Sequence, residues 1–377
     1  MTTYDLIIVG AGALGTFHAY HAAKRGKRVL LLEKDSRPVS STVRNFGQVV
    51  PSGLSGRWFD YGRRSLEIYR EIQSQTDITV RQNGSVYVAS DQDEWALCNE
   101  LFDRRQSQSY PCELLSADQT LARYPHLQPN YVQGGLYFPD ELSVEPDSMI
   151  YRVIDFMVER YGVVYQPNAT VIDCQSAMGR AAVTLAGDDY YEAERVIICS
   201  GYEFRLLFPD LFANSGLIVS KLQMMRTVPM SGISLPGNIL TGLTIRRYEA
   251  FAECPSYANL TAARPEHLVD LEKWGIHLLF KQAIDGSFII GDSHEYAPAN
   301  RIDDLGFDTK DAINALIINE AKRIVNFPVE QISQTWAGFY AQTPAEIFEH
   351  DVDDHIRIVT GIGGKGMTSA AGYTEGV

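Results

Sequence analysis

The stretch of sequence that most constrains the fold runs from Thr3 to Lys34 and reads TYDLIIVGAGALGTFHAYHAAKRGKRVLLLEK. The apolar run 5–9 is typical of a buried parallel strand. Residues 13–25 predict a helix, and residues 29–32 predict a second strand. Together they predict a complete βαβ unit, in which the turn between the first strand and the helix carries the spacing G-x-G-x-x-G.

The three glycines of that turn predict a dinucleotide site. Gly10 permits the tight turn, Gly12 lets a pyrophosphate approach the backbone, and Gly15 lets the helix pack closely on the strand. The start of the helix offers free N–H groups and the positive end of its dipole to the phosphates. Glu33, which ends the second strand, can accept hydrogen bonds from ribose hydroxyls. For the motif alone, a glycine-rich turn in another α/β protein is the alternative interpretation.

Composition and charge narrow the class of protein. The chain has 377 residues, enough for two domains, and its formal net charge of −14 disfavours nucleic acid as a partner. Its five cysteines form no C-x-x-C pair, which indicates neither a zinc site nor a disulfide framework and favours the cytoplasm. No apolar stretch has the length of a membrane span, and we expect the N-terminal apolar run to be a strand rather than a signal peptide.

Four stretches of the chain carry a resemblance to a known family. They are the opening βαβ unit, ERVIICSG at 194–201, WAGFY at 336–340 and TGIGGKGMT at 360–368. In this order they resemble the D-amino acid oxidase, glycine oxidase and sarcosine oxidase family of FAD flavoproteins. Within that family, VRNFGQVVPSG at 43–53 and the GGKGMT ending resemble the subgroup associated with aminophosphonate breakdown.

The resemblance implies an α/β fold in which two domains are built from alternating segments. One is a Rossmann-like FAD-binding domain, and the other is an α+β substrate domain built on a mixed or antiparallel sheet. The FAD-binding domain is expected at 1–80, 146–220 and 331–377, and the substrate domain at 81–145 and 221–330. Helices are expected near 58–72, 93–107, 116–124, 146–161 and 310–325.

The resemblance also implies which residues hold the FAD. The adenosine end falls to the opening unit and its neighbours, namely Gly10, Gly12, Ala13, Leu14, Gly15, Glu33, Lys34 and Val171. Phosphate contacts are expected at Ser41, Thr42, Ser200 and Gly201, and the isoalloxazine ring is expected beside Asn45, Gly47 and Gln48. The last loop would present N–H groups to the flavin N1/O2 edge through Gly361, Gly363, Gly364, Lys365, Gly366, Met367 and Thr368. On the residues alone, that loop could equally be a tight strand-to-helix turn.

Two departures from the family pattern affect cofactor attachment and substrate. Sarcosine oxidases attach FAD through a cysteine, and Gly338 stands at that position, so noncovalent FAD is expected. Amino-acid oxidases read W-x-G-x-R-P where this chain has Tyr340, which offers one hydrogen bond but no charge and no fork for a carboxylate. A simple α-amino acid held in the usual way is therefore not expected. The oxygen-activating lysine of sarcosine oxidases falls on a strand matching 288–290, which has no lysine.

The predicted function is FAD-dependent oxidation of a small primary or secondary amine, with hydride transfer to the flavin and hydrolysis of the imine. An N-alkylated aminophosphonate is the specific candidate, and oxygen or another acceptor takes the electrons. Its phosphonate would be held by some of Arg44, Arg246, Arg247 and Lys365. Tyr340 and Tyr248 are the candidate catalytic residues. No metal site is predicted.

Two alternatives remain open on the sequence. One is a flavoprotein subunit that passes electrons to a partner chain of a hetero-oligomeric amine dehydrogenase. The other is a nicotinamide-dependent dehydrogenase that shares the opening βαβ unit. The sequence leaves the oligomeric state open.

Overall fold

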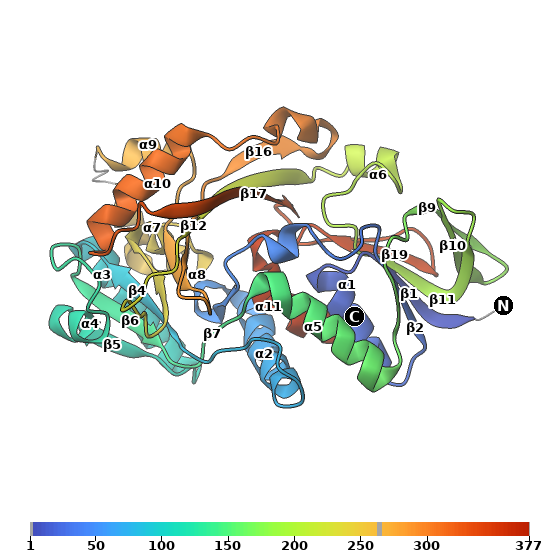
Figure 1. Ribbon diagram of the computed structural model, residues 1–377, viewed down its shortest axis with the longest axis horizontal. Coiled ribbons are helices and arrows are strands. Elements are labelled where there is room, and N and C mark those ends of the chain that lie inside the picture. Colours follow the sequence, from blue (N-terminus) through green and yellow to red (C-terminus); the bar gives the residue numbers. More distant parts are fainter. Residues whose placement is uncertain (1–2, 262–265, 377) are drawn as a thin grey trace.

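The computed structural model describes residues 3–261 and 266–376, which form two large sheets joined by helices (Figure 1). Residues 1, 2, 262–265 and 377 fall inside the predicted domain ranges but lie outside the described residues. In the described part of the chain, every helix is too short or too polar to cross a bilayer.

The first sheet has a parallel centre with the order β19-β11-β1-β2-β8. These strands are β1 (Tyr4–Val9), β2 (Val29–Leu32), β8 (Val164–Gln166), β11 (Tyr190–Ile198) and β19 (Ile356–Thr360). Antiparallel strands extend it, namely β9 (Val171–Ala177), β10 (Arg180–Leu185) and β18 (Phe348–Asp351). The apolar runs of β1 and β2 are fully paired, as strands buried in a parallel sheet require.

Helices cover this sheet and point their own apolar side chains into the core. Helix α1 (Ala13–Lys24) is buried along nearly its whole length, with Phe17 and Tyr20 inaccessible to solvent. It contacts α5 (Pro146–Tyr161) and α11 (Gly366–Tyr373), and α11 in turn packs on α2 (Gly56–Gln73). Because α1 begins directly after the glycine turn, this packing fixes where its N-terminus points.

The second sheet is mixed and mainly antiparallel, with the order β16-β12-β15-β14-β13-β4-β6-β5 and β17 paired to β12. Its strands are β4 (Ser85–Ala89), β5 (Glu113–Ser116), β6 (Gly134–Phe138), β12 (Ile218–Thr227), β13 (Asn238–Leu240), β14 (Leu279–Gln282), β15 (Phe288–Gly291), β16 (Glu295–Pro298) and β17 (Ile332–Gln342). Around it lie α3 (Gln92–Ser107), α4 (Ala117–Arg123), α7 (Gly242–Ile245), α8 (Glu249–Ala252), α9 (Leu268–Lys273) and α10 (Asp311–Ile324). The predicted fold class, an α/β nucleotide-binding sheet with a second mixed sheet, is confirmed.

Two long strands connect the halves of the molecule. Strand β12 pairs with β17 along its entire length, from Ile218 opposite Gln342 to Thr227 opposite Ile332, and the two strands run between the sheets in Figure 1. Strand β17 lies in the range 331–377, which the sequence analysis assigned to the FAD-binding domain, yet it hydrogen-bonds into the second sheet. The domain boundaries stay a prediction. Short elements complete the chain, including β3 (Gln48–Val49), β7 (Leu142–Ser143) and α6 (Pro209–Ala213).

Candidate active site

A cavity of about 600 Å³ extends from the carboxyl ends of β1 and β2 to strands β12, β14 and β17 of the second sheet. The carboxyl ends of parallel strands are where α/β sheets bind their ligands. At one end the lining includes the glycine turn and Glu33, and at the other it includes Tyr248, His277 and Tyr340. The cavity is therefore shared by the two sheets.

The glycine turn could not accommodate side chains at two of its three glycines. Gly10 has φ of 99°, and a Cβ there would lie 2.4 Å from the carbonyl oxygen of Cys199. A Cβ at Gly15 would lie 1.8 Å from the carbonyl oxygen of Gly10, so this glycine allows α1 to approach β1. Gly12 lines the cavity, and its nearest obstacle is the Thr42 hydroxyl at 3.3 Å. The roles predicted for Gly10 and Gly15 match these contacts.

Glu33 holds the glycine turn in place and also lines the cavity. Its carboxylate accepts a hydrogen bond from the Ala11 N–H at 3.0 Å and another from the Asp35 N–H at 3.1 Å. The side chain is buried. A carboxylate has about four lone-pair positions, so two acceptor positions remain for hydroxyl groups of a ligand.

The loop 41–48 is shaped by its own side chains. Thr42 accepts a hydrogen bond from the Ala13 N–H at 3.0 Å, which ties the loop to the start of α1. The Asn45 side chain donates to the Thr42 carbonyl oxygen and accepts from the Gly47 N–H, both at 2.7 Å. Gln48 donates to the Phe280 carbonyl oxygen at 3.3 Å, which connects the loop to the second sheet.

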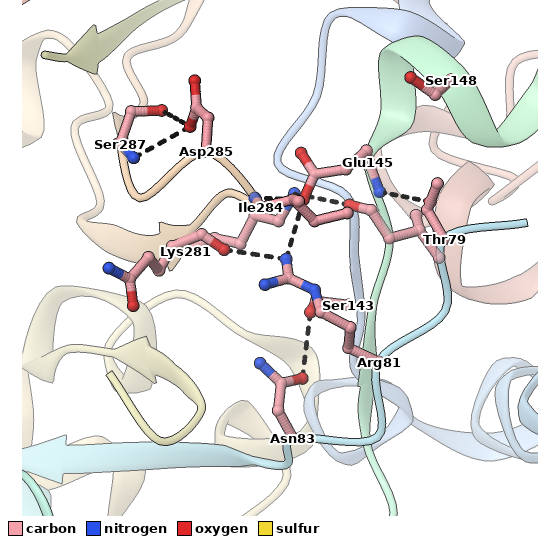
Figure 2. Close-up of polar contacts among 12 residues, drawn as sticks. Thr79, Arg81, Asn83, Ser143, Glu145, Ser148, Lys281, Ile284, Asp285 and Ser287 are labelled. Carbon is pink, nitrogen blue, oxygen red and sulfur yellow. Dashed lines mark hydrogen bonds and ion pairs between the residues drawn. The ribbon is translucent and has the colours of Figure 1, made fainter. Parts of the chain in front are cut away.

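A cluster of charged residues, Arg81, Glu145 and Lys281, lies next to the loop 41–48 (Figure 2). Glu145 receives the guanidinium of Arg81 at 2.9 Å and lies 3.0 Å from the ammonium of Lys281, whose pKa burial lowers to about 8. Lys281 also donates to the Val144 carbonyl oxygen at 2.6 Å. A Cβ at Gly47 would lie 2.2 Å from that same oxygen, so the cluster sets the position of Gly47.

Lys281 lies on the strand that pairs with 288–290, where the family resemblance places the lysine of sarcosine oxidases. Strand β15 (Phe288–Gly291) has no lysine, but the register pairs Ile289 with Lys281 of β14. The Lys281 side chain is fully buried and engaged by Glu145 and Val144, and it does not line the cavity.

The loop before α11 forms the opposite wall of the cavity. Gly361 and Gly363 adopt φ of 72° and 65°, values that favour glycine, and the residues from Gly361 to Thr368 all line the cavity. Helix α11 begins at Gly366 inside this wall. The starts of α1 and α11 therefore both present backbone N–H groups to one cavity, which suits a ligand with negative charge at two places.

At the far end of the cavity lies a polar cluster that the sequence analysis missed. The Nδ1 atom of His277 lies 2.8 Å from Oδ1 of Asp292, and Nδ1 of His294 lies 3.8 Å from the same oxygen. The Tyr340 hydroxyl is 3.1 Å from Nε2 of His294. All four residues line the cavity, and His277, Asp292 and His294 are buried. The feature of the sequence that comes nearest to predicting the cluster is a pair of histidines, His277 and His294, that flank the strand-like runs 279–282 and 288–291.

The charge states of this cluster follow from burial and from its members. Burial lowers the pKa of His294 to about 3, so His294 is neutral. Burial alone would raise the pKa of Asp292, but His277, His294 and Arg247 lower it overall, so Asp292 is ionised. Burial raises the pKa of the Tyr340 and Tyr248 hydroxyls, so both remain protonated at neutral pH.

The ligand atoms of His277, Asp292 and His294 lie within 4.8 Å of one another, close enough for a metal ion. However, His294 already uses both ring nitrogens, one with the Gly275 carbonyl oxygen at 3.0 Å and the other with Tyr340. The arrangement is a series of close polar contacts from Tyr340 through His294 and Asp292 to His277.

The cavity brings together most of the predicted site residues. They are Gly10, Gly12, Ala13, Leu14, Glu33, Lys34, Ser41, Thr42, Arg44, Asn45, Gln48, Val171, Ser200, Gly201, Arg247, Tyr248, Gly338, Tyr340, Gly361, Gly363, Gly364, Lys365, Gly366, Met367 and Thr368. Gly15 and Gly47 lie behind the lining and act through close backbone packing. Arg246 is the predicted substrate contact that the cavity does not include.

Arg246 does not line the cavity, and its side chain forms ion pairs within the fold. Its guanidinium pairs with Asp91 and with Glu94, and the Glu94 side chain is almost completely buried. The hypothesis that Arg246 holds substrate therefore needs correction, because two carboxylates already occupy its donors.

We expect Arg246→Ala to lower the free energy of unfolding by about 3 kcal/mol, because it leaves the buried Glu94 carboxylate without its partner. Urea denaturation measures this change. The matched control is Arg205→Ala, which breaks an exposed pair with Asp303 and should cost less than about 1 kcal/mol. Equal losses for the two variants would contradict the structural role of Arg246.

Fold and cavity together are those of an α/β dinucleotide-binding protein with a second sheet that lines the same cavity. The model of the family described as FAD dependent oxidoreductase (DAO) matches residues 5–375. The chain belongs to this family, which confirms the resemblance found in the sequence.

Individual relatives are distant and differ in their reactions. A glycerol 3-phosphate dehydrogenase of Caloramator mitchellensis is 24% identical, covering 97% of this chain and 71% of the relative. A glycine oxidase of Bacillus licheniformis is 23% identical, covering 95% and 87%. The crystal structure of glycine oxidase from Geobacillus kaustophilus superposes with a TM-score of 0.78 at 16% identity, covering 100% of this chain and 93% of that one.

The cavity residues fit the FAD of this family. The glycine turn leaves the backbone open at Gly12, Glu33 offers acceptors, and the two helix starts offer N–H groups to the phosphates and the flavin. When bound, FAD supplies the acceptor for a hydride. The chain supplies the binding surface, the position of the substrate and the proton chemistry.

All flavin should enter the supernatant when the holoprotein is precipitated with acid, because Gly338 has no side chain to form a covalent link. Absorbance of supernatant and redissolved pellet measures the partition. Cys199 lines the cavity, but it is a thiol whose pKa burial raises, which disfavours a reactive thiolate. Flavin that stays with the pellet would refute noncovalent binding.

Proposed function

We propose that the protein oxidises a small primary or secondary amine by hydride transfer to FAD, followed by hydrolysis of the imine. The observation that carries this proposal is the far end of the cavity, where hydrogen-bonding and carboxylate groups that suit an amine line the same cavity as cations that suit an anion. Asp292, His277 and Tyr340 form the first set, and Arg247 and Lys365 line the same cavity.

We further propose an N-alkylated aminophosphonate as the substrate. Tyr340 occupies the place of the carboxylate-clamping arginine and is engaged by His294, so an anion would be held elsewhere. Arg247 donates to the Tyr296 hydroxyl at 3.2 Å and to the Gly275 carbonyl oxygen at 3.3 Å, so these hydrogen bonds go to neutral groups, while the Asp292 carboxylate interacts with its charge. Lys365 lies 3.5 Å from Glu249, and Arg44 donates to the Ala337 carbonyl oxygen. These three cations support a dianionic group.

A second candidate is the oxidation of an alcohol that carries a phosphate, which the glycerol 3-phosphate dehydrogenase relative supports. The role of an electron-transferring subunit with a partner chain also stays a proposal, as does the choice between oxygen and another acceptor. We place the protein in the reducing cytoplasm, because all five cysteines are free thiols.

The test is an anaerobic screen in which bleaching of the flavin reports substrate oxidation. Glycine, sarcosine, D-alanine, N-methyl-2-aminoethylphosphonate and glycerol 3-phosphate are compared with the purified holoprotein. Fastest bleaching by the phosphonate supports the proposal, and bleaching by glycerol 3-phosphate alone refutes amine oxidation. A tightly copurifying partner chain, together with an isolated chain that no amine bleaches, would favour the subunit role instead.

A further inference from the structure

We propose that His277, supported by Asp292, accepts a proton from the ammonium group of the bound substrate before the carbon–hydrogen bond breaks. The proposal rests on the amine oxidation proposed above and does not depend on the phosphonate. It assigns a catalytic role to His277 and a positioning role to Asp292.

The two residues are held together by their strands. The backbone N–H of Asp292 donates to the His277 carbonyl oxygen at 2.8 Å, and the N–H of His277 donates back at 3.1 Å. His277 precedes β14 and Asp292 follows β15, so the hairpin of the second sheet fixes their separation. Nδ1 of His277 lies 2.8 Å from Oδ1 of Asp292, and His277 lines the cavity. Nε2 is therefore the ring nitrogen of His277 that is left to accept a proton from a ligand.

The reaction itself requires such an acceptor. An alkylamine has a pKa near about 10 and therefore arrives protonated at neutral pH. Hydride loss from the neighbouring carbon needs the nitrogen lone pair, which the extra proton occupies. In the proposed step the N–H bond of the ammonium breaks, its electron pair stays on nitrogen, and the proton moves to Nε2 of His277. The ionised Asp292 stabilises the imidazolium that forms, as a carboxylate does behind a catalytic histidine.

Other groups at this end of the cavity are less suited to accept the proton. His294 donates a hydrogen bond from Nδ1 to the Gly275 carbonyl oxygen and accepts one at Nε2 from the Tyr340 hydroxyl. Neither ring nitrogen of His294 is therefore available to accept a proton. The two tyrosines are protonated at neutral pH and can only donate or share their protons. The charged and titratable groups that face His277 from the surrounding elements are Arg247, Tyr248, Asp292, His294 and Tyr340.

The experiment compares pH profiles of anaerobic flavin reduction for the FAD-loaded wild type, His277→Gln and Asp292→Asn. Sarcosine and N-methyl-2-aminoethylphosphonate are the substrates, and the second-order rate constant is measured from about pH 6 to about pH 10, which spans the titration of a histidine and of an amine. His350→Gln is the matched control, because His350 is exposed on β18 and does not line the cavity. The absorbance spectrum of the bound flavin in each variant reports whether the pocket is intact.

We expect His277→Gln to be about 10²-fold or more slower than the wild type near neutral pH, the usual effect of losing a general base. The deficit should shrink with rising pH, because the free amine then binds already deprotonated. Asp292→Asn should show the same trend with a smaller loss, and the flavin spectrum of all variants should match that of the wild type.

Three outcomes would overturn the proposal. A loss in His277→Gln that is constant across pH, or a profile identical to the wild type, would refute proton transfer to His277 while leaving amine oxidation in place. If His277→Gln fails to hold flavin, the Asp292→Asn profile decides by the same criterion. A wild type that neither amine reduces would refute the proposed function and the proton step together.

Discussion

Gly12→Val should purify as a folded protein without flavin colour. Gly12 has φ of −68°, which any residue adopts, and its Cβ position is open except for the Thr42 hydroxyl at 3.3 Å. The branched side chain would therefore fit the backbone but fill the part of the cavity that a pyrophosphate must enter. Flavin absorbance per protein should fall close to zero while the circular dichroism spectrum stays native.

Two other glycines sharpen this prediction. Gly10→Val should fail to fold, because φ of 99° and the Cys199 carbonyl oxygen at 2.4 Å exclude a side chain. Gly26→Ala has open space and should keep its flavin, at a cost of about 1 kcal/mol for its positive φ. Glu33→Gln should weaken FAD binding less than Gly12→Val, since one neutral acceptor remains. A Gly12→Val protein that is folded and fully yellow would show that the pyrophosphate lies elsewhere.

Arg247→Ala and Lys365→Ala should each lower kcat/KM for N-methyl-2-aminoethylphosphonate by about 10- to 100-fold, the usual loss for a charge-assisted hydrogen bond of 1.5–3 kcal/mol. The analogue N-methylpropylamine, which lacks the phosphonate, should be affected far less, because it has no anion for either cation to hold. Arg44→Ala is tested in the same way, since Arg44 also lines the cavity.

The control for these variants is Arg301→Ala, an exposed arginine paired with Asp304 outside the cavity. It should leave both rate constants unchanged. If every cavity variant affects the phosphonate and the amine equally, no cation holds the anion and the phosphonate proposal fails. Amine oxidation would survive that result.

The sequence was most informative where structure depends on neighbouring residues. The opening strand, glycine turn, helix and second strand follow from local patterns, and the structure has β1, α1 and β2 within a residue or so of the predicted ranges. Helix α5 begins and ends at the predicted Pro146 and Tyr161, because Pro146 suits a first turn and Gly162 adopts φ of 69° after the last one.

The substrate end of the cavity depends on pairing between distant segments, which no local pattern reveals. His277 and Asp292 come together only because β14 and β15 form a hairpin, and Tyr340 joins them from a third strand. The neighbouring residues Arg246 and Arg247 also show that a local pattern does not predict which side chain enters the cavity. Neighbouring residues at a helix end point in directions about 100° apart, so one pairs with Glu94 while the other reaches the cavity.

The path of the chain between the two sheets has a consequence for how such proteins diversify. The chain leaves the first sheet after β2, returns for β8 to β11, leaves again for β12 to β17 and returns for β18 and β19. No single crossover between two related genes could therefore transfer the second sheet without also transferring strands of the first. Substrate preference in a protein built this way changes residue by residue on a shared scaffold, and a new specificity must arise without disturbing the strands that also hold the flavin.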